Sequence, residues 1–399
     1  MSKSNITIHL LLVLLLFLLL NPFLALIILS LIKVNSKKVE YFFHLMFSIS
    51  FGFFFYCRDI GVDFYSNASD DVAAYLYLFK GYYTSSCGDL FINFLQAPSG
   101  NEIGFHFFWK FISFFTFNPT DLIFLNYFFY FFLLSIFSSK ISKSYFPFLI
   151  IGYFFIFSIS LYSLAHVWRQ QMAVFVFYIA VTNFFNNSNP KLNRLLIWST
   201  PFIHLTSIYF VVLFYVFQFF EKKKKLDIKN IFKVISVFFI SQFLLIQFVI
   251  RLFEYLGLTK FLGYLGGYSV DKSQFFIYLP FYIIITLIVF RHLNKNKTNN
   301  FFITVILVCL TIPFSMPQFN ALYDRFINLS LPLLGLFFAN YIIYSNQKLM
   351  NGIGFILIIS IGYLRLRPEY LNGEGVISFI GNEDAFNPFN SVLNLLINY

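Results

Sequence analysis

Apolar runs long enough to cross a lipid bilayer recur from one end of this 399-residue chain to the other. A transmembrane helix needs about 20 mostly apolar residues. Only 11% of the residues are charged, far below the share in a soluble domain. The sequence therefore predicts an all-α polytopic membrane protein. The runs lie near residues 6–32, 41–57, 121–138, 145–163, 167–185, 195–220, 231–250, 275–290, 301–317, 326–344 and 350–364.

The first run is too long for a signal peptide and no small-residue cleavage site follows it, so we interpret it as the first span. Together the runs predict about 11–12 transmembrane helices in a single membrane domain, residues 1–364. Residues 365–399 are expected to form an outward-facing tail.

Short basic clusters between the runs set the predicted topology. Basic loops face the cytoplasm, so an even number of crossings must separate neighbouring clusters. This rule puts 17 of the 28 basic residues on the cytoplasmic side, with only three of the 17 acids. The net charge of +11 is then accounted for by loops, and no nucleic-acid partner is predicted. The clusters are Lys33/Lys37/Lys38, Lys140/Lys143, Lys191/Arg194, Lys222–Lys225 with Lys229 and Lys233, Arg291/Lys295/Lys297, and Lys348.

The same parity makes two local predictions. The stretch 102–117 is not a span; Glu102, His106 and Lys110 share one helical face, which favours an amphipathic helix at the outer membrane boundary. The run 195–220 must break near Pro201, which places His204 close to an outward tip. The alternative is one long helix with the four lysines outside.

Ionisable residues concentrate in the first large outer loop, residues 58–118. In a membrane protein such a concentration marks a functional site. Residues 68–83 show helical spacing and predict a second interfacial helix. The ionisable residues up to Glu102 are Arg58, Asp59, Asp63, Asp70, Asp71, Lys80, Asp89 and Glu102.

Further polar residues fall at predicted outer helix ends, so three separated arginines are expected on one side of the membrane. Arginine suits bidentate phosphate recognition. Each feature also has a structural interpretation: a snorkelling Arg58, a helix cap at Asp324, a helix–helix hydrogen bond at His204. Three consecutive polar residues cannot all face lipid, so part of Arg169–Gln171 must face an interior. The residues are Arg58, Arg169, Gln170, Gln171, His204, Tyr323, Asp324 and Arg325.

The three cysteines show no metal-ligand spacing, and no metal or cofactor is predicted. Cys57 and Cys87 flank the outer loop and would pair in an oxidising compartment; a free buried cysteine is equally ordinary.

Five short motifs follow in a fixed order: R-x4-D, E-x-G-F, RQ-x-x-A, IH-x-[TS] and R-F. In this order, over about residues 50–330, the chain resembles the EpsG/Wzy-like membrane polysaccharide polymerases. It departs from them in His-Leu-Thr-Ser, where the family pattern is His-x-Ser, and in a tail without a matching motif. The motif residues are Arg58 and Asp63; Glu102, Gly104 and Phe105; Arg169, Gln170 and Ala173; Ile203, His204 and Ser207; Arg325 and Phe326.

The resemblance implies a GT-C-like glycosyltransferase at the outer face of the bacterial cytoplasmic membrane. Such proteins join undecaprenyl-pyrophosphate-linked repeat units into capsule, exopolysaccharide or O-antigen chains, beside a flippase and a chain-length regulator. The resemblance also implies that Arg58, Arg169 and Arg325 bind the pyrophosphate through their positive charges. Candidate bases are Asp63, the first choice, Glu102 and His204. Other candidate substrate-binding residues are Asp70, Asp71, His106, Gln170, Gln171, Tyr323 and Asp324.

Three other classes are compatible with a polytopic chain. A lipid-linked oligosaccharide flippase favours internal repeats and charges at helix centres, and neither is evident. An O-antigen ligase is expected to have a long late outer loop, whereas the late loops here are short. A membrane acyltransferase needs a catalytic histidine on the cytoplasmic side, opposite to the predicted position of His204.

Overall fold

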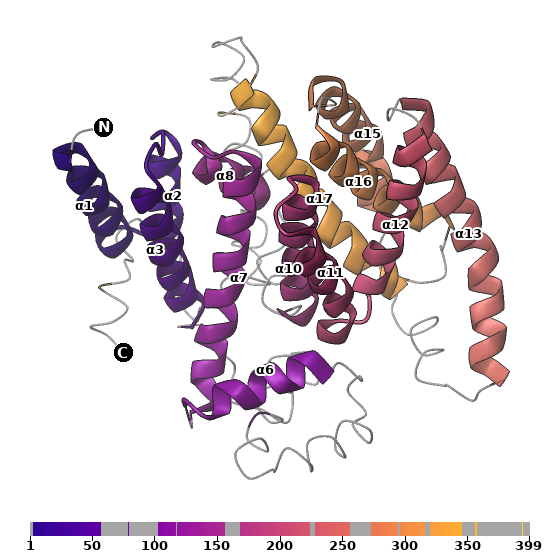
Figure 1. The fold of residues 1–399 in the computed structure, drawn as a ribbon, viewed down its shortest axis with the longest axis horizontal. Coiled ribbons are helices and arrows are strands. Elements are labelled where there is room, and N and C mark those ends of the chain that lie inside the picture. The colour runs from indigo at the N-terminus through magenta and orange to yellow at the C-terminus, as the bar shows by residue number, and fades with distance from the viewer. Residues whose placement is uncertain are drawn as a thin grey trace. The chain divides into compact units, whose positions relative to one another are not determined.

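The computed structural model describes residues 3–56, 79, 103–116, 118–155, 168–223, 228–255, 273–293, 296–315, 320–344, 356 and 393. Every regular element within these ranges is an α-helix (Figure 1). They are α1 (Lys3–Leu19), α2 (Pro22–Ser30), α3 (Lys37–Tyr56), α6 (Ile103–Ser113), α7 (Pro119–Ile141), α8 (Phe146–Phe155), α10 (Trp168–Phe185), α11 (Pro190–Ile203), α12 (Ser207–Lys223), α13 (Ile228–Tyr255), α15 (Ser273–Leu293), α16 (Lys297–Ser315) and α17 (Asn320–Tyr344).

Three of the described helices are long and apolar enough to cross a membrane: Lys37–Tyr56, Asp121–Ile141 and Lys297–Ser315. Shorter apolar helices accompany them, among them Ser207–Glu221 and Leu329–Tyr344. The prediction of an all-α membrane protein is therefore confirmed. The total of 11–12 spans, the single membrane domain and the GT-C-like architecture stay predictions, as does the helix at 68–83, which apart from Phe79 lies outside the described residues.

The chain divides after Ile208 into two compact units, which we describe separately. The first contains α1 to α11 and the second begins at Tyr209 and contains most of α12 together with α13 to α17.

The first apolar run, interpreted from the sequence as the first span, forms two helices instead of one continuous helix. The break lies at Asn21, whose side chain caps α2 by accepting a hydrogen bond from the Phe23 N–H at 3.0 Å. Pro22 occupies the first turn, where its missing N–H and fixed φ favour a helix start. The helix therefore breaks at the Asn21 cap and Pro22, although the residues on both sides are uniformly hydrophobic.

Stacked phenylalanines form the core of the first unit. Phe51 of α3 lies at its centre, with its ring centroid 5.0 Å from Phe23, 5.0 Å from Phe131 and 5.7 Å from Phe154. These contacts join α2, α7 and α8 to α3, and the four rings are buried. Phenylalanine-rich runs therefore build protein core here as well as hydrophobic spans.

Two neighbouring basic clusters meet at one end of the α3–α7 pair. The Val34 N–H donates to the Ser144 carbonyl at 2.9 Å, and Lys33 Nζ lies 5.8 Å from the Tyr145 ring centroid. Among the described residues, the two candidate spans between these clusters are α3 and α7, and the predicted topology requires an even number of crossings there.

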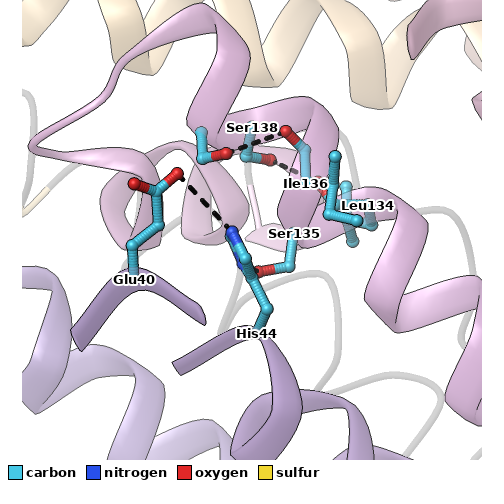
Figure 2. Close-up of polar contacts among 7 residues, drawn as sticks. Glu40, His44, Leu134, Ser135, Ile136 and Ser138 are labelled. Atoms are coloured by element: carbon cyan, nitrogen blue, oxygen red, sulfur yellow. Dashed lines mark hydrogen bonds and ion pairs between the residues drawn. The ribbon is translucent and has the colours of Figure 1, made fainter. Parts of the chain in front are cut away.

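A buried polar contact ties α3 to α7 near this end (Figure 2). His44 Nδ1 lies 2.5 Å from Ser135 Oγ, and His44 Nε2 lies 3.6 Å from Glu40 Oε1. Nδ1 thus lies within hydrogen-bond distance of Ser135, and Nε2 faces a carboxylate, so both ring nitrogens point to polar groups inside a span. Ser138, one turn on, bonds only its own helix, through the Leu134 carbonyl at 2.8 Å.

In the second unit α16 packs against α13, α15 and α17. Phe302 of α16 lies 5.7 Å from Phe337 of α17, between ring centroids, and both side chains are fully buried. At the start of α16, Lys297 forms an ion pair with Glu221 of α12 at 2.7 Å. The predicted cytoplasmic clusters after α12 and before α16 therefore lie at one end of the unit.

Candidate functional site

Helix α6 rests on the C-terminal end of α11 through a glycine. A Cβ atom on Gly104 would lie 2.9 Å from the Phe202 carbonyl oxygen and 3.1 Å from its carbonyl carbon. Only a residue without a side chain allows the two backbones to approach this closely. Figure 1 shows α6 lying across the end of α7. The E-x-G-F and IH motifs, about a hundred residues apart in sequence, are thus in contact.

The predicted helix at 102–117 is confirmed as α6, Ile103–Ser113. Its buried face consists of Phe105, Trp109 and Ile112. His106 is half-buried, and Lys110 is buried with Nζ 5.3 Å from the Phe114 ring centroid. The exposed side chains are apolar: Phe107, Phe111, Phe114 and Phe115. Lys110 is therefore covered by protein and His106 is partly covered, while the exposed side chains of α6 and of the turn that follows it form a phenylalanine stripe.

The predicted break in the run 195–220 is also confirmed. Helix α11 contains Pro201 and ends at Ile203, and His204 adopts an extended conformation with φ −152° and ψ 124°. With 14 residues, α11 is about 21 Å long, shorter than the roughly 30 Å hydrocarbon core. A chain break within that depth requires cover by protein, and His204 is buried.

The side chain of His204 is held by the residues that follow it. Its Nδ1 lies 2.7 Å from Thr206 Oγ1 and accepts a hydrogen bond from the Thr206 N–H at 3.4 Å. Because Nδ1 accepts, the proton of the neutral ring is on Nε2. The Ser207 hydroxyl donates to the His204 carbonyl at 2.6 Å and starts α12. The sequence His-Leu-Thr-Ser thus fixes both the ring and the turn.

The first turn of α10 carries Arg169, Gln170 and Gln171, and the two glutamines are only 1% and 3% exposed. Arg169 is half-buried. Gln170 Nε2 and Gln171 Oε1 are buried and find no hydrogen-bond partner within the described ranges. A buried polar atom left unpaired costs about 1–3 kcal/mol, so both atoms require an explanation.

In the second unit, Tyr323, Asp324 and Arg325 belong to the first two turns of α17, and their side chains are outside the description. The next residue, Phe326, packs on Tyr209 with ring centroids 4.7 Å apart. Tyr209 accepts a hydrogen bond from Gln242 Nε2, and Ser315 Oγ donates to Gln242 Oε1 at 2.6 Å.

Sequence reasoning missed this Tyr209–Gln242–Ser315 chain, which links α12, α13 and α16 beside the start of α17. The polar signal for it in the sequence was the Ser241–Gln242 pair within the apolar run 231–250.

The remaining predicted site residues lie outside the described residues. They are Arg58, Asp63, Asp70, Asp71 and Glu102, together with Cys57 and Cys87. In the part of the chain that the structure describes, no three His, Cys, Asp or Glu side chains group into a candidate metal site. The structure therefore brings α6 and its His106 to the α11–His204 end, while the meeting of the three arginines stays a prediction.

Apolar helices of spanning length, with buried polar residues at helix ends, define a polytopic helical membrane protein. A family model, that of the EpsG family, matches residues 45–370, well over half of the chain, and all five motifs lie inside this range. The chain belongs to the EpsG family. Comparisons with curated proteins and with solved structures match nothing. Family membership indicates a membrane protein of polysaccharide biosynthesis with glycosyltransferase-like activity.

Proposed function

We propose that the protein is a polysaccharide polymerase of the bacterial cytoplasmic membrane. It joins repeat units carried on undecaprenyl pyrophosphate into capsule, exopolysaccharide or O-antigen chains at the outer face. The observation that carries the proposal is the contact of Gly104 with the Phe202 carbonyl, because it seats the end of the acidic outer loop against the His204 turn. This contact supports our assignment of the E-x-G-F and IH motifs, far apart in sequence, to one site.

The reaction has a simple electron balance. A carboxylate, Asp63 or Glu102, takes the proton of an acceptor sugar hydroxyl, and the hydroxyl oxygen bonds to the anomeric carbon of the donor. The bond from that carbon to the phosphate oxygen breaks, and its electron pair leaves with the pyrophosphate. Cations stabilise this growing charge, and we assign that role to Arg58, Arg169 and Arg325.

His204 suits hydrogen-bond donation better than proton removal. Its Nδ1 already accepts from Thr206, so the neutral ring presents an N–H at Nε2. A donor of this kind orients a sugar oxygen or a phosphate oxygen. The candidate base is therefore one of the two carboxylates, with Asp63 preferred since it follows Arg58 closely.

The phenylalanine stripe of α6 fits a helix that lies at a membrane boundary. Phe107 and Phe111 are four residues apart on α6 and Phe115 continues this spacing in the turn after the helix, so one side is apolar and exposed. In a bilayer this side contacts lipid, from which a polyprenyl-linked donor approaches. The polymerase then works with lipid-linked glycan supplied by a flippase, and a chain-length regulator acts on its product.

Deletion of the gene with analysis of surface glycans tests the function. A polymerase predicts that single repeat units reach the lipid carrier or the cell surface and that long chains disappear. Accumulation of lipid-linked units on the cytoplasmic side, with no export, would instead identify a flippase.

A further inference from the structure

A third buried carboxamide lies on the helix next to the two glutamines. Asn126 of α7 is 1% exposed, and its Nδ2 donates to the Leu122 carbonyl at 2.6 Å. Its Oδ1 is buried and has no hydrogen-bond partner among the residues with a described structure. Three amide groups in neighbouring helices thus each hold one unpaired polar atom.

Ring contacts give the register of α7 against α10. Tyr130 lies 5.4 Å from Phe175, and Phe137 lies 5.3 Å from Tyr178, between ring centroids. Residue numbers rise in the same direction on both helices, so the pair is parallel.

Asn126 is one turn before Tyr130, and Gln171 is one turn before Phe175. Positions four residues apart share a helix face, and the Tyr130–Phe175 and Phe137–Tyr178 pairs place Gln171 between the levels of Asn126 and Tyr130. Asn126 and Gln171 therefore lie within about one turn of each other along the α7–α10 interface.

Aromatic side chains lie beyond these two residues, toward the helix C-termini. The Tyr130 hydroxyl donates to the Tyr153 hydroxyl at 3.2 Å, and Tyr153 also contacts Phe175 at 5.8 Å between ring centroids. The two tyrosine hydroxyls are hydrogen-bonded to each other and not to the unpaired carboxamide atoms.

The unpaired atoms define which chemical groups could bind to them. Asn126 Oδ1 and Gln171 Oε1 are acceptors, whereas Gln170 Nε2 is a donor. A carboxylate or phosphate has only acceptors and leaves both oxygens unpaired. A metal cation leaves the amide N–H unpaired. A hydroxyl both donates and accepts, so sugar hydroxyls match the chemistry of all three atoms.

We propose that Asn126, Gln170 and Gln171 bind hydroxyl groups of a sugar residue of the lipid-linked substrate. This rests on the proposed polymerase function and adds Asn126, a residue outside every motif, to the site. Arg169 directly precedes Gln170 in the chain. The sugar contacts therefore adjoin the arginine assigned to the pyrophosphate, as expected for the first sugar of the donor.

Two near-isosteric substitutions test the proposal in the gene-deletion strain: Asn126→Leu and Gln171→Met. Each removes a carboxamide and keeps the volume of a buried side chain. Asn340→Leu is the matched control, because Asn340 is also buried on a helix with an unpaired Oδ1 but lies at the far end of α17. Chain growth is measured as repeat units polymerised per molecule of membrane-inserted protein, and thermal unfolding is measured in detergent.

The proposal expects both site variants to unfold at or above the wild-type temperature, since an apolar residue replaces an unsatisfied amide. Chain growth should fall ~10-fold or more in both, and Asn340→Leu should retain it. Normal chain growth in Gln171→Met at wild-type protein level overturns the proposal, whatever happens to Asn126→Leu. Loss of polymer strictly in proportion to lost folded protein also overturns it, because the amides are then structural.

These outcomes differ from failure of the proposed function. If the wild-type gene does not restore long chains in the deletion strain, the polymerase assignment fails. If it does restore them and both variants match it, only the sugar-binding assignment fails.

Discussion

The carbonyl oxygen of Phe202 lies 2.9 Å from the point that a Cβ atom on Gly104 would occupy. This contact seats α6 on the end of α11 beside the His204 turn. The obstacle is backbone of α11, which cannot rotate away as a side chain can.

Gly104→Ala is therefore expected to displace α6 and to lower chain growth ~10-fold or more, with a loss of stability of about 1–3 kcal/mol. Thermal unfolding in detergent and polymer length in complemented cells measure the two effects.

Gly52→Ala is the control, since its Cβ would meet the Phe124 ring at 3.0 Å, and a ring can shift. Equal losses in the two variants would contradict the special role of Gly104.

His204 is expected to act as a hydrogen-bond donor, held by Thr206. His204→Gln keeps an amide N–H donor without a basic ring nitrogen, whereas His204→Ala keeps neither. The donor role predicts clear residual chain growth in His204→Gln and ~10-fold less in His204→Ala. Complete loss in both variants, at normal protein level, would point to a histidine base instead.

The His44–Ser135 contact is expected to be structural. Ser135→Ala leaves His44 Nδ1 buried without its partner, which predicts a loss of about 1–3 kcal/mol in stability. Polymerisation per folded molecule should stay at the wild-type level. Ser138→Ala serves as the control, because its hydroxyl bonds only the Leu134 carbonyl of its own helix and should matter less. A selective loss of chain growth in Ser135→Ala would disprove this interpretation.

The topology predicts which exposed positions react from which side. In a chain whose three cysteines are replaced, cysteine introduced at Lys33 or Lys297 should be labelled from the cytoplasm. Cysteine introduced at Asn118, the last residue of the predicted outer loop, should be labelled from outside the cell. The three side chains are exposed, so access is governed by the membrane alone. If the cysteines at positions 33 and 297 were labelled from opposite sides of the membrane, the predicted cytoplasmic location of both basic clusters would be wrong.

Charge and helix-breaking chemistry predicted much of the local structure. Basic clusters required an interruption between Arg194 and Lys222, and Pro201 located it next to His204, where α11 ends. The same reasoning passed over Asn21–Pro22, because the hydropathy of the first run is uniform on both sides of the break. A cap followed by proline was the available sign there.

Other features depend on which helices become neighbours. The sequence alone does not show that Gly104 faces a backbone carbonyl, or that Asn126 and Gln171 lie close along the α7–α10 interface. A single asparagine in a phenylalanine-rich run indicates neither its burial nor its unpaired oxygen. Such contacts arise only when α6, α7, α10 and α11 pack together.

The central claim is most directly tested by a reaction with purified components. The detergent-solubilised protein is mixed with undecaprenyl-pyrophosphate-linked repeat units isolated from the deletion strain, without nucleotide sugar or added metal. The account predicts a ladder of lipid-linked chains, release of undecaprenyl pyrophosphate in equal number to the new linkages, and loss of both products in Arg169→Ala. Repeat units that remain single with the wild-type protein, in conditions where it stays folded, would contradict the account.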